Sequence, residues 1–456
     1  MKTFIVKNKK VLGLFGIVFI MFIFWLFPYF GHKGVLPSTI VRPFEITGIL
    51  LIGLGAGLSL SLKKDSYWFT ILLVFTPFVF AHPFDAKTIP WELIVACIFA
   101  LTGAIISLVR FKYKLKKGPF FLGIVIFSIS CILGGVFNFN KFYLLQYVVV
   151  SLIVTALLVL FVYLHSINSI TFLDFSWIMF ALGLYISMQC AAYLFTNHNF
   201  TEMLANKDLN VGWGISNNIA TIMILLVPFT AYLIFHYQKW KTLFFAISVI
   251  PQSIAVIFTY SRGGLFAYIL MLIAVFIYGF FVVKEKFTYF LLAMGAVLSI
   301  FLILMVGMAF KPEVMNRFFD IISIDKLNMA PRIEIYKTYL SNLKPNFIFG
   351  KGLFEPFISH FEIDIPGSGN YLWGHGTWIH CLYTTGIVGV GAWLFHTVQK
   401  YVYLLKEHSK ESMIVFFSFI FSGLYGMIDV SFYFINYMIL FIVILTMFKN
   451  KLVEGE

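Results

Sequence analysis

Three side chains of this sequence could bind and activate a phosphorylated substrate beside a membrane. His375 stands between two glycines directly before an apolar segment, and a histidine can accept a proton near neutral pH. Arg262 is followed by two glycines at another such boundary, and Arg332 lies in a long polar stretch. The planar guanidinium of arginine matches the oxygens of a phosphate. These residue types favour a base acting beside a bound anion.

Each of these residues also has a purely structural interpretation. Arg262 can extend its side chain to the membrane interface, and Arg332 can be a solvated loop residue. His375 can be an interfacial histidine that is hydrogen-bonded to a backbone carbonyl. Asp429, near the end of another apolar segment, is either a functional acid or the structural partner of an arginine.

The elements that must position these residues are membrane spans. Of the 456 residues, 61% are hydrophobic and only 12% are charged, whereas roughly 25% of a soluble domain is charged. A span needs about 20 apolar residues. The candidates are 11–31, 45–62, 66–82, 91–109, 119–137, 142–164, 175–196, 218–235, 242–259, 265–283, 288–310, 377–398, 412–430 and 431–447. The sequence therefore predicts an all-α polytopic membrane protein with about 14 transmembrane helices.

One long polar loop interrupts the spans between Lys311 and His375 and carries seven basic residues. Within it, Pro331 to Leu343 predicts a short helix, because proline suits a first helical position and apolar residues recur at four-residue spacing. The expected organisation is three parts: helices 1 to 11 over residues 1–310, a large extracytoplasmic loop over 311–376, and helices 12 to 14 with a cytoplasmic tail over 377–456.

Lysine and arginine in the connecting segments indicate the orientation, since they concentrate on the cytoplasmic side. With the N-terminus inside, the inner segments hold 20 of the 33 basic residues and the short outer loops hold six. The remaining seven are those of the long loop. The split predicts that both termini are cytoplasmic and that the long loop is outside.

Several function classes lack their usual sequence support. The chain has no GxxxxGK[ST], HExxH or CxxC motif, which argues against ATP-driven transport, zinc hydrolysis and a thiolate metal site. The net charge of +13 comes from basic residues spread over short segments between spans, so it does not indicate nucleic-acid binding. We therefore expect no cofactor and no metal.

The order of several short motifs resembles the O-antigen ligase and polymerase superfamily of bacteria. These motifs are Asn217-Asn218-Ile219-Ala220, Ser261-Arg262-Gly263-Gly264, Arg332 with Tyr336, Gly350-Lys351-Gly352-Leu353-Phe354, His375 with Gly386 and Gly389, and more loosely Gly426-Met427-Ile428-Asp429. The resemblance covers about residues 217 to 429. It departs at Gly376, where the ligases usually have Asn, Ser or Gln after the histidine.

The resemblance implies an inverting, metal-independent glycosyltransferase in the bacterial cytoplasmic membrane. Its donor would be an undecaprenyl-pyrophosphate-linked glycan on the outer face, and its acceptor a glycan or another lipid-linked molecule among the membrane lipids. Arg262 and Arg332 would bind the pyrophosphate, and His375 would be the catalytic base. Residues in supporting roles would be Asp429, Asn218, Tyr336 and Trp373, with Tyr371 and Trp378 also available to stack on sugar rings.

The departure at Gly376 favours a polysaccharide polymerase of the O-antigen or capsule type over an O-antigen ligase. Two other classes stay open. A flippase for lipid-linked oligosaccharides should place its basic residues along a central cavity, whereas Arg262 and Arg332 are predicted at or beyond the outer boundary. A purely structural scaffold would tolerate replacement of both arginines and of His375.

Overall fold

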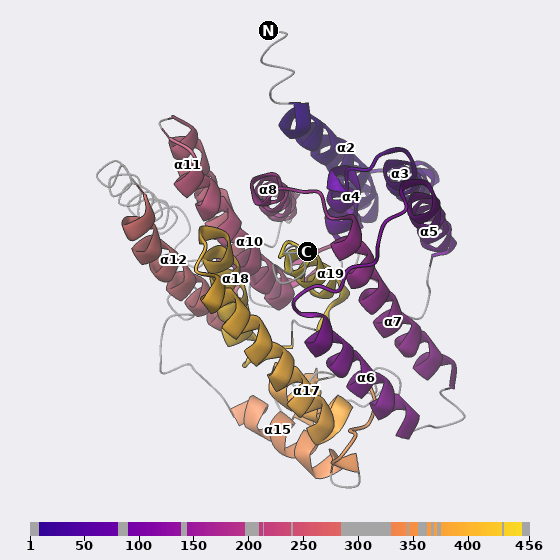
Figure 1. Cartoon of the computed structure of the whole chain (residues 1–456), viewed down its shortest axis with the longest axis vertical. Helices are drawn as coiled ribbons and strands as arrows, with labels where there is room; N and C mark the ends of the chain where they lie inside the picture. Colours follow the sequence, from indigo (N-terminus) through magenta and orange to yellow (C-terminus); the bar gives the residue numbers. More distant parts are fainter. Residues whose placement is uncertain are drawn as a thin grey trace.

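The chain forms a bundle of long helices whose architecture follows the apolar segments (Figure 1). The structure is a computed structural model and describes residues 9–80, 90–137, 144–196, 209–212, 214–238, 240–283, 330–343, 346–353, 363–365, 369–371, 375–430 and 433–448. Within these ranges, eight helices are long and apolar enough to cross a membrane, and several shorter apolar helices accompany them. The predicted all-α polytopic membrane fold is confirmed.

Every predicted span that lies in the described residues coincides with a helix, and the predicted span 288–310 lies outside those residues. The helices are α2 (Lys9–His32), α3 (Ser38–Leu62), α4 (Tyr67–Val79), α5 (Trp91–Phe111), α6 (Phe121–Phe137), α7 (Leu144–Ile167), α8 (Phe172–Thr196), α10 (Ser216–His236), α11 (Trp240–Phe258), α12 (Arg262–Val282), α15 (Ala330–Leu343), α17 (Thr377–Glu407), α18 (Lys410–Gly426) and α19 (Ile435–Leu445). Two short antiparallel ribbons pair β1 (Asn210–Val211) with β2 (Gly214–Ile215) and β3 (Ile363–Ile365) with β4 (Gly369–Tyr371).

Helix α10 forms the centre of the bundle. Its side chains are buried on all sides, and it packs against α8, α11, α12 and α18. By contrast, the peripheral helices expose large apolar side chains: Leu101 is 63% exposed on α5, and Phe281 is 73% exposed on α12. A helix that is apolar all round belongs in a protein core or a membrane. The exposed apolar faces therefore suit lipid.

Helices α3 and α5 lie unusually close together at the edge of the bundle. A Cβ atom on Gly103 would lie 2.3 Å from the carbonyl oxygen of Gly57, so a side chain cannot fit there. Small residues let membrane helices approach in this way. At one end of the pair, Arg42 makes a 2.6 Å ion pair with the fully buried Glu92.

The short helix predicted in the polar loop is confirmed as α15. Its apolar residues Ile335, Tyr339 and Leu343 are buried and pack against Ile379 and Tyr383 near the start of α17. Figure 1 shows α15 (orange) beside this end of α17, at one end of the bundle. The four-residue spacing places the three apolar side chains on one face of the helix, and this face packs α15 against α17.

Helix α17 is interrupted at Gly386, whose φ of 66° lies in the left-handed region. The chain segment 346–353 fills the interruption with four backbone hydrogen bonds, Lys351 N to Tyr383 O, Gly352 N to Thr384 O, Ile387 N to Phe347 O and Val388 N to Ile348 O. A Cβ on Gly386 would lie 2.2 Å from the Ile348 oxygen, and one on Gly350 would lie 2.4 Å from the Thr385 nitrogen. Both glycines are therefore needed for this close backbone contact.

Candidate functional site

His375 is held by a tyrosine of the loop helix. The hydroxyl of Tyr336 donates a 2.8 Å hydrogen bond to the backbone oxygen of His375. His375 has a φ of 44°, and a non-glycine residue adopts this left-handed conformation only when its surroundings favour it. Helix α15 thus fixes the backbone of the histidine at the entrance to α17.

The glycine after the histidine lies in a confined space. A Cβ on Gly376 would lie 3.2 Å from the hydroxyl of Tyr336 and 3.1 Å from the backbone oxygen of Met427. A side chain at position 376 would therefore be in tight contact with the tyrosine hydroxyl, and its neighbours would have to shift by a few tenths of an ångström. This tight contact favours a small residue directly after the histidine.

Arg262 is the first residue of α12 and follows a side-chain cap. The hydroxyl of Ser261 accepts a 3.2 Å hydrogen bond from the backbone nitrogen of Gly264, as a serine N-cap does. A Cβ on Gly263 would lie 2.2 Å from Ile428 Cδ1, and one on Gly264 would lie 2.7 Å from Ala220 Cβ. The two glycines thus let α12 approach α10 and the end of α18, and this packing fixes the start of α12, where Arg262 lies.

A hydrogen-bonded chain connects this start of α12 to Asp429. The hydroxyl of Tyr425 lies 2.7 Å from that of Ser261 and donates a 3.1 Å bond to Oδ2 of Asp429. The other carboxylate oxygen accepts a 2.7 Å bond from Val430 N. Thr377 donates a 3.1 Å bond to the backbone oxygen of Asp429. Asp429 is 4% exposed, and it joins the segment of Arg262 to the segment of His375.

Arg332 lies one helical turn before Tyr336 on α15, and the four-residue spacing places both on the same face. Burial raises the pKa of Tyr336, while the charge of Arg332 lowers this pKa and that of Asp429 raises it. Both charges therefore act at the tyrosine that holds His375. Arg262 and Arg332 are each partly exposed, as an anion-binding side chain must be.

The other residues predicted to support the site are Asn218, Trp373 and Trp378. Asn218 is fully buried and accepts a 2.7 Å hydrogen bond from Nδ2 of Asn436, so it joins the starts of α10 and α19. Trp373 lies outside the described residues. The ring of Trp378 meets that of Tyr336 edge-on, with 5.5 Å between centroids.

Sequence reasoning missed Tyr425, Thr377 and Asn436 as members of this network. Tyr425 lies four residues before Asp429, a spacing that brings two side chains to one helical face, so its position was accessible from the sequence. The Asn218–Asn436 pair has no such signal, because 218 residues separate the two. Among the described residues, no three His, Cys, Asp or Glu side chains gather in a group that could hold a metal ion.

The family comparison agrees with the motif order. The family model described as O-antigen ligase matches residues 242–394. This stretch is similar to the O-antigen ligase family. The resemblance predicted from the sequence is confirmed over this stretch, about a third of the chain. A search of curated proteins finds no match.

The matched stretch contains Arg262, Arg332 and His375, while Asp429 and Asn218 lie beyond its ends. The family supports a membrane-bound function of the O-antigen ligase or polymerase type, and thus an enzyme that processes glycans. It also implies lipid-linked glycan substrates. The multiple apolar helices agree with a multi-pass membrane protein.

Proposed function

We propose that this protein is a polymerase that joins undecaprenyl-pyrophosphate-linked glycan repeats on the outer face of the bacterial cytoplasmic membrane. The observation that supports this most strongly is that hydrogen bonds hold the segments that carry Arg262, Asp429 and His375 together at the α15 end of the bundle. It combines cationic side chains with a histidine beside a membrane. The excess of basic residues in the other connecting segments supports an orientation with this end outside and both termini in the cytoplasm.

The two arginines are proposed to bind the donor's pyrophosphate. Arg262 begins α12, where the positive end of the helix dipole also favours an anion. Arg332 projects from the first turns of α15. In the reaction, the bond between the anomeric carbon and the pyrophosphate oxygen breaks, and the leaving group gains negative charge. Fixed guanidinium groups stabilise that charge without reorganising.

His375 is proposed to act as the general base. Its side chain accepts the proton of an acceptor hydroxyl while the oxygen of that hydroxyl attacks the anomeric carbon from the face opposite the pyrophosphate. The new glycosidic bond then has inverted configuration, and the proton passes from the imidazole to solvent. The bond from Tyr336 goes to the backbone oxygen of His375, so it fixes the backbone that carries the imidazole. No step requires a metal ion.

The acceptor distinguishes the two activities within this family. A polymerase uses another lipid-linked glycan, and a ligase uses a lipid core or other envelope component. The glycine at position 376 supports the polymerase, since it departs from the polar residue of the ligase pattern. The description of the matching family as O-antigen ligase favours the ligase as the second candidate.

Replacement of the histidine tests the proposal. His375→Ala should abolish long glycan chains while lipid-linked repeats accumulate, because general base catalysis typically contributes about 10²–10⁴-fold. His408→Ala is a matched control: His408 also has a positive φ but caps the opposite end of α17. Glycan length is measured on gels, with membrane protein level checked by immunoblot. Near-normal chains in the His375 variant would refute the assignment of the base.

A further inference from the structure

A set of basic side chains lies where α3 and α5 end. The two helices run parallel, because Gly53 packs against Ala96 and Gly57 packs against Gly103, and Figure 1 shows them side by side. Their last turns therefore lie at the same end of the bundle. The last turn of α5 and the segments after the two helices carry seven basic residues, all exposed: Lys63, Lys64, Arg110, Lys112, Lys114, Lys116 and Lys117. We call this set the basic patch.

Hydrogen bonds hold the two segments of the basic patch together. The guanidinium of Arg110 donates a 3.0 Å bond to the backbone oxygen of Ser61, and the hydroxyl of Tyr113 donates a 3.0 Å bond to the backbone oxygen of Lys64. The backbone nitrogen of Lys116 donates a 2.8 Å bond to the hydroxyl of Ser166 at the end of α7. These bonds fix the backbone of the patch, and none of them uses the ammonium group of a lysine.

The basic patch lies at the end of the bundle opposite α15. Helix α6 runs antiparallel to α17, because Gly123 near its start packs against His396 and Gly134 near its end packs against Thr384. The segment that leads into α6 therefore lies beside the last turns of α17. Helix α15 packs against the first turns of α17, at Ile379 and Tyr383. The patch is thus separate from the candidate site.

The positive charge of the basic patch is not neutralised within the described part of the chain. Among the described residues, no carboxylate forms an ion pair with any of its cations. Asp65, which follows Lys64 directly, lies 3.5 Å from Nζ of Lys10, and the same nitrogen lies 2.8 Å from a carboxylate oxygen of Asp174. The nearby acids thus pair with a lysine outside the patch, and its own cations are available to an external anion.

The connection between α17 and α18, at the same end of the bundle, has a different charge pattern. Its Lys406 and Lys410 are each followed directly by a glutamate, Glu407 and Glu411, and these four charges cancel. Basic residues concentrate on the cytoplasmic side of membrane proteins in general. That bias does not explain why one connection at this end is strongly basic and another is balanced.

Exposed apolar side chains adjoin the basic patch. Val109 is 74% exposed and directly precedes Arg110, and Leu115 is 68% exposed between Lys114 and Lys116. This alternation suits the boundary between hydrocarbon and headgroups, because the leucine can enter the bilayer while the ammonium groups stay at its surface. The patch therefore continues the lipid-facing surface of α5, which favours a lipid over a soluble partner.

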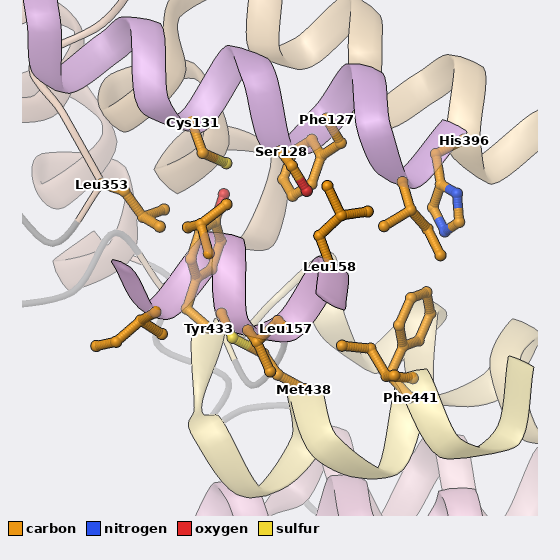
Figure 2. Close-up of a pocket in the computed structure, with 14 residues that line it drawn as sticks. Phe127, Ser128, Cys131, Leu157, Leu158, Leu353, His396, Tyr433, Met438 and Phe441 are labelled. Atoms are coloured by element: carbon orange, nitrogen blue, oxygen red, sulfur yellow. The ribbon is translucent and has the colours of Figure 1, made fainter. Parts of the chain in front are cut away.

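The interior of the bundle offers a contrasting environment. A cavity of about 70 Å³ lies between α6, α7, α17 and α19, and Figure 2 shows Phe127, Leu157 and Met438 around it. Its lining includes Tyr433 and His396 but, among the described residues, no lysine or arginine. Apolar walls do not suit a charged phosphate, because the phosphate would lose its hydrogen bonds to water. A phosphate therefore suits the exposed patch and not this cavity.

We propose that the basic patch binds the phosphate headgroups of anionic phospholipids in the leaflet on its side of the membrane. Lysine binds a phosphate as a point charge and needs no fixed geometry, and each basic residue close to an anionic membrane surface adds to the attraction. In the proposed orientation this leaflet faces the cytoplasm. The bound headgroups hold the ends of α3 and α5 at the membrane surface, on the side opposite the candidate site.

Removal of two charges tests this assignment. Lys114→Gln combined with Lys116→Gln keeps the backbone bond of residue 116 and should weaken binding of phosphatidylglycerol about tenfold or more. Lys406→Gln combined with Lys410→Gln removes the same charge at the same end, so it is the matched control and should bind within about twofold of wild type. Binding is measured by titrating the purified full-length protein in nonionic detergent with phosphatidylglycerol, followed by native mass spectrometry. Wild-type affinity in the first variant, or an equal loss in both, would overturn the proposal.

Other ligands identify the source of the phosphate on the wild-type protein. Phosphatidylcholine, which has no net charge, should not displace phosphatidylglycerol, and its equal binding would contradict the proposal. Full competition by glycerol 3-phosphate would identify a soluble phosphate as the ligand, and full competition by polyglutamate would identify an acidic protein segment. Either result would exclude the lipid surface as the partner.

Charge and salt distinguish electrostatic binding from a loss of folding. Lys114→Arg combined with Lys116→Arg retains both charges and should bind phosphatidylglycerol as the wild type does. Salt screens exposed charges, so the affinity of the wild type should fall as the ionic strength rises. An affinity that does not depend on salt would contradict the proposal. Binding is measured without glycan transfer, so the result is independent of the proposed function.

Discussion

The hydroxyl of Tyr425 donates a 3.1 Å hydrogen bond to Oδ2 of Asp429, and both residues are almost completely buried. The same hydroxyl lies 2.7 Å from that of Ser261, the residue before Arg262. One phenol therefore connects Asp429 to the start of α12. Because Thr377 binds the backbone of Asp429, a displacement at Tyr425 would reach the segment of His375 as well.

Tyr425→Phe removes this connection and keeps the ring. We expect glycan transfer to fall about two- to tenfold. A hydrogen bond contributes a net free energy of about 0.5–1.5 kcal/mol in proteins. Tyr437→Phe is the matched control, because Tyr437 is also a buried tyrosine paired with a serine, at 3.0 Å from Ser422. Glycan chain length and thermal stability are measured for both variants.

The two variants separate a positioning role from a general loss of packing. If Tyr425→Phe and Tyr437→Phe lose the same stability and the same activity, the hydroxyl of Tyr425 has no special function. A loss of activity in Tyr425→Phe that Tyr437→Phe does not share would place Tyr425 among the residues that position Arg262 and Asp429.

Tyr336→Phe should loosen the backbone of His375, since it removes the 2.8 Å bond to its carbonyl oxygen. We expect a similar two- to tenfold loss of transfer, from a hydrogen bond of about 1 kcal/mol. Lys337→Ala, on the exposed side of the same helix, should retain activity. Unchanged transfer in Tyr336→Phe would show that the left-handed conformation of His375 persists without this bond.

The same bond predicts a dependence on pH. Burial raises the pKa of Tyr336 above its ordinary value of 10.0. A group with a raised pKa stabilises the fold fully below its unfolded pKa, and this contribution disappears as the pH rises through the folded pKa. The difference in melting temperature between wild type and Tyr336→Phe should therefore be constant at neutral pH and shrink only in alkaline solution. A difference that already changes near pH 7 would implicate another group.

The spans and the loop helix were predictable because each depends on a local pattern. Hydropathy over about 20 residues identifies a span, and the spacing of Ile335, Tyr339 and Leu343 identifies the buried face of α15. The close backbone contact between the segment of Gly350 and the interruption of α17 at Gly386 was not predictable. A glycine motif does not show which backbone segment approaches it. The pairing of Asn218 with Asn436 and the cavity beside Tyr433 likewise depend on how distant helices pack.

The predicted orientation can be tested on the intact protein. A reporter fused near Lys114 should lie in the cytoplasm and one fused near Ile365 should lie outside, because inner segments hold 20 basic residues and short outer loops hold six. Paired alkaline phosphatase and green fluorescent protein fusions give opposite signals on the two sides. Identical sidedness at Lys114 and Ile365 would contradict the proposed topology and remove the site from the outer face.

The roles of the arginines give the most specific prediction. If Arg262 and Arg332 bind a pyrophosphate through paired N–H donors, lysine retains the charge but loses the planar fork. Arg262→Lys and Arg332→Lys should therefore both impair transfer, and alanine should impair it further at either position. A residue that only extends to the membrane interface behaves differently, because lysine reaches that interface equally well.

Two measurements decide between these roles of Arg262 and Arg332. Glycan chain length is compared in cells depleted of the native protein, with membrane level followed by immunoblot. Lys337→Arg, which introduces a guanidinium on α15 one residue after Tyr336, serves as a control for nonspecific effects of changing the cation. Loss of long chains in both lysine variants at normal protein level would support paired binding of the pyrophosphate. Full activity in both would exclude it, and a flippase or a scaffold would then account better for the two arginines.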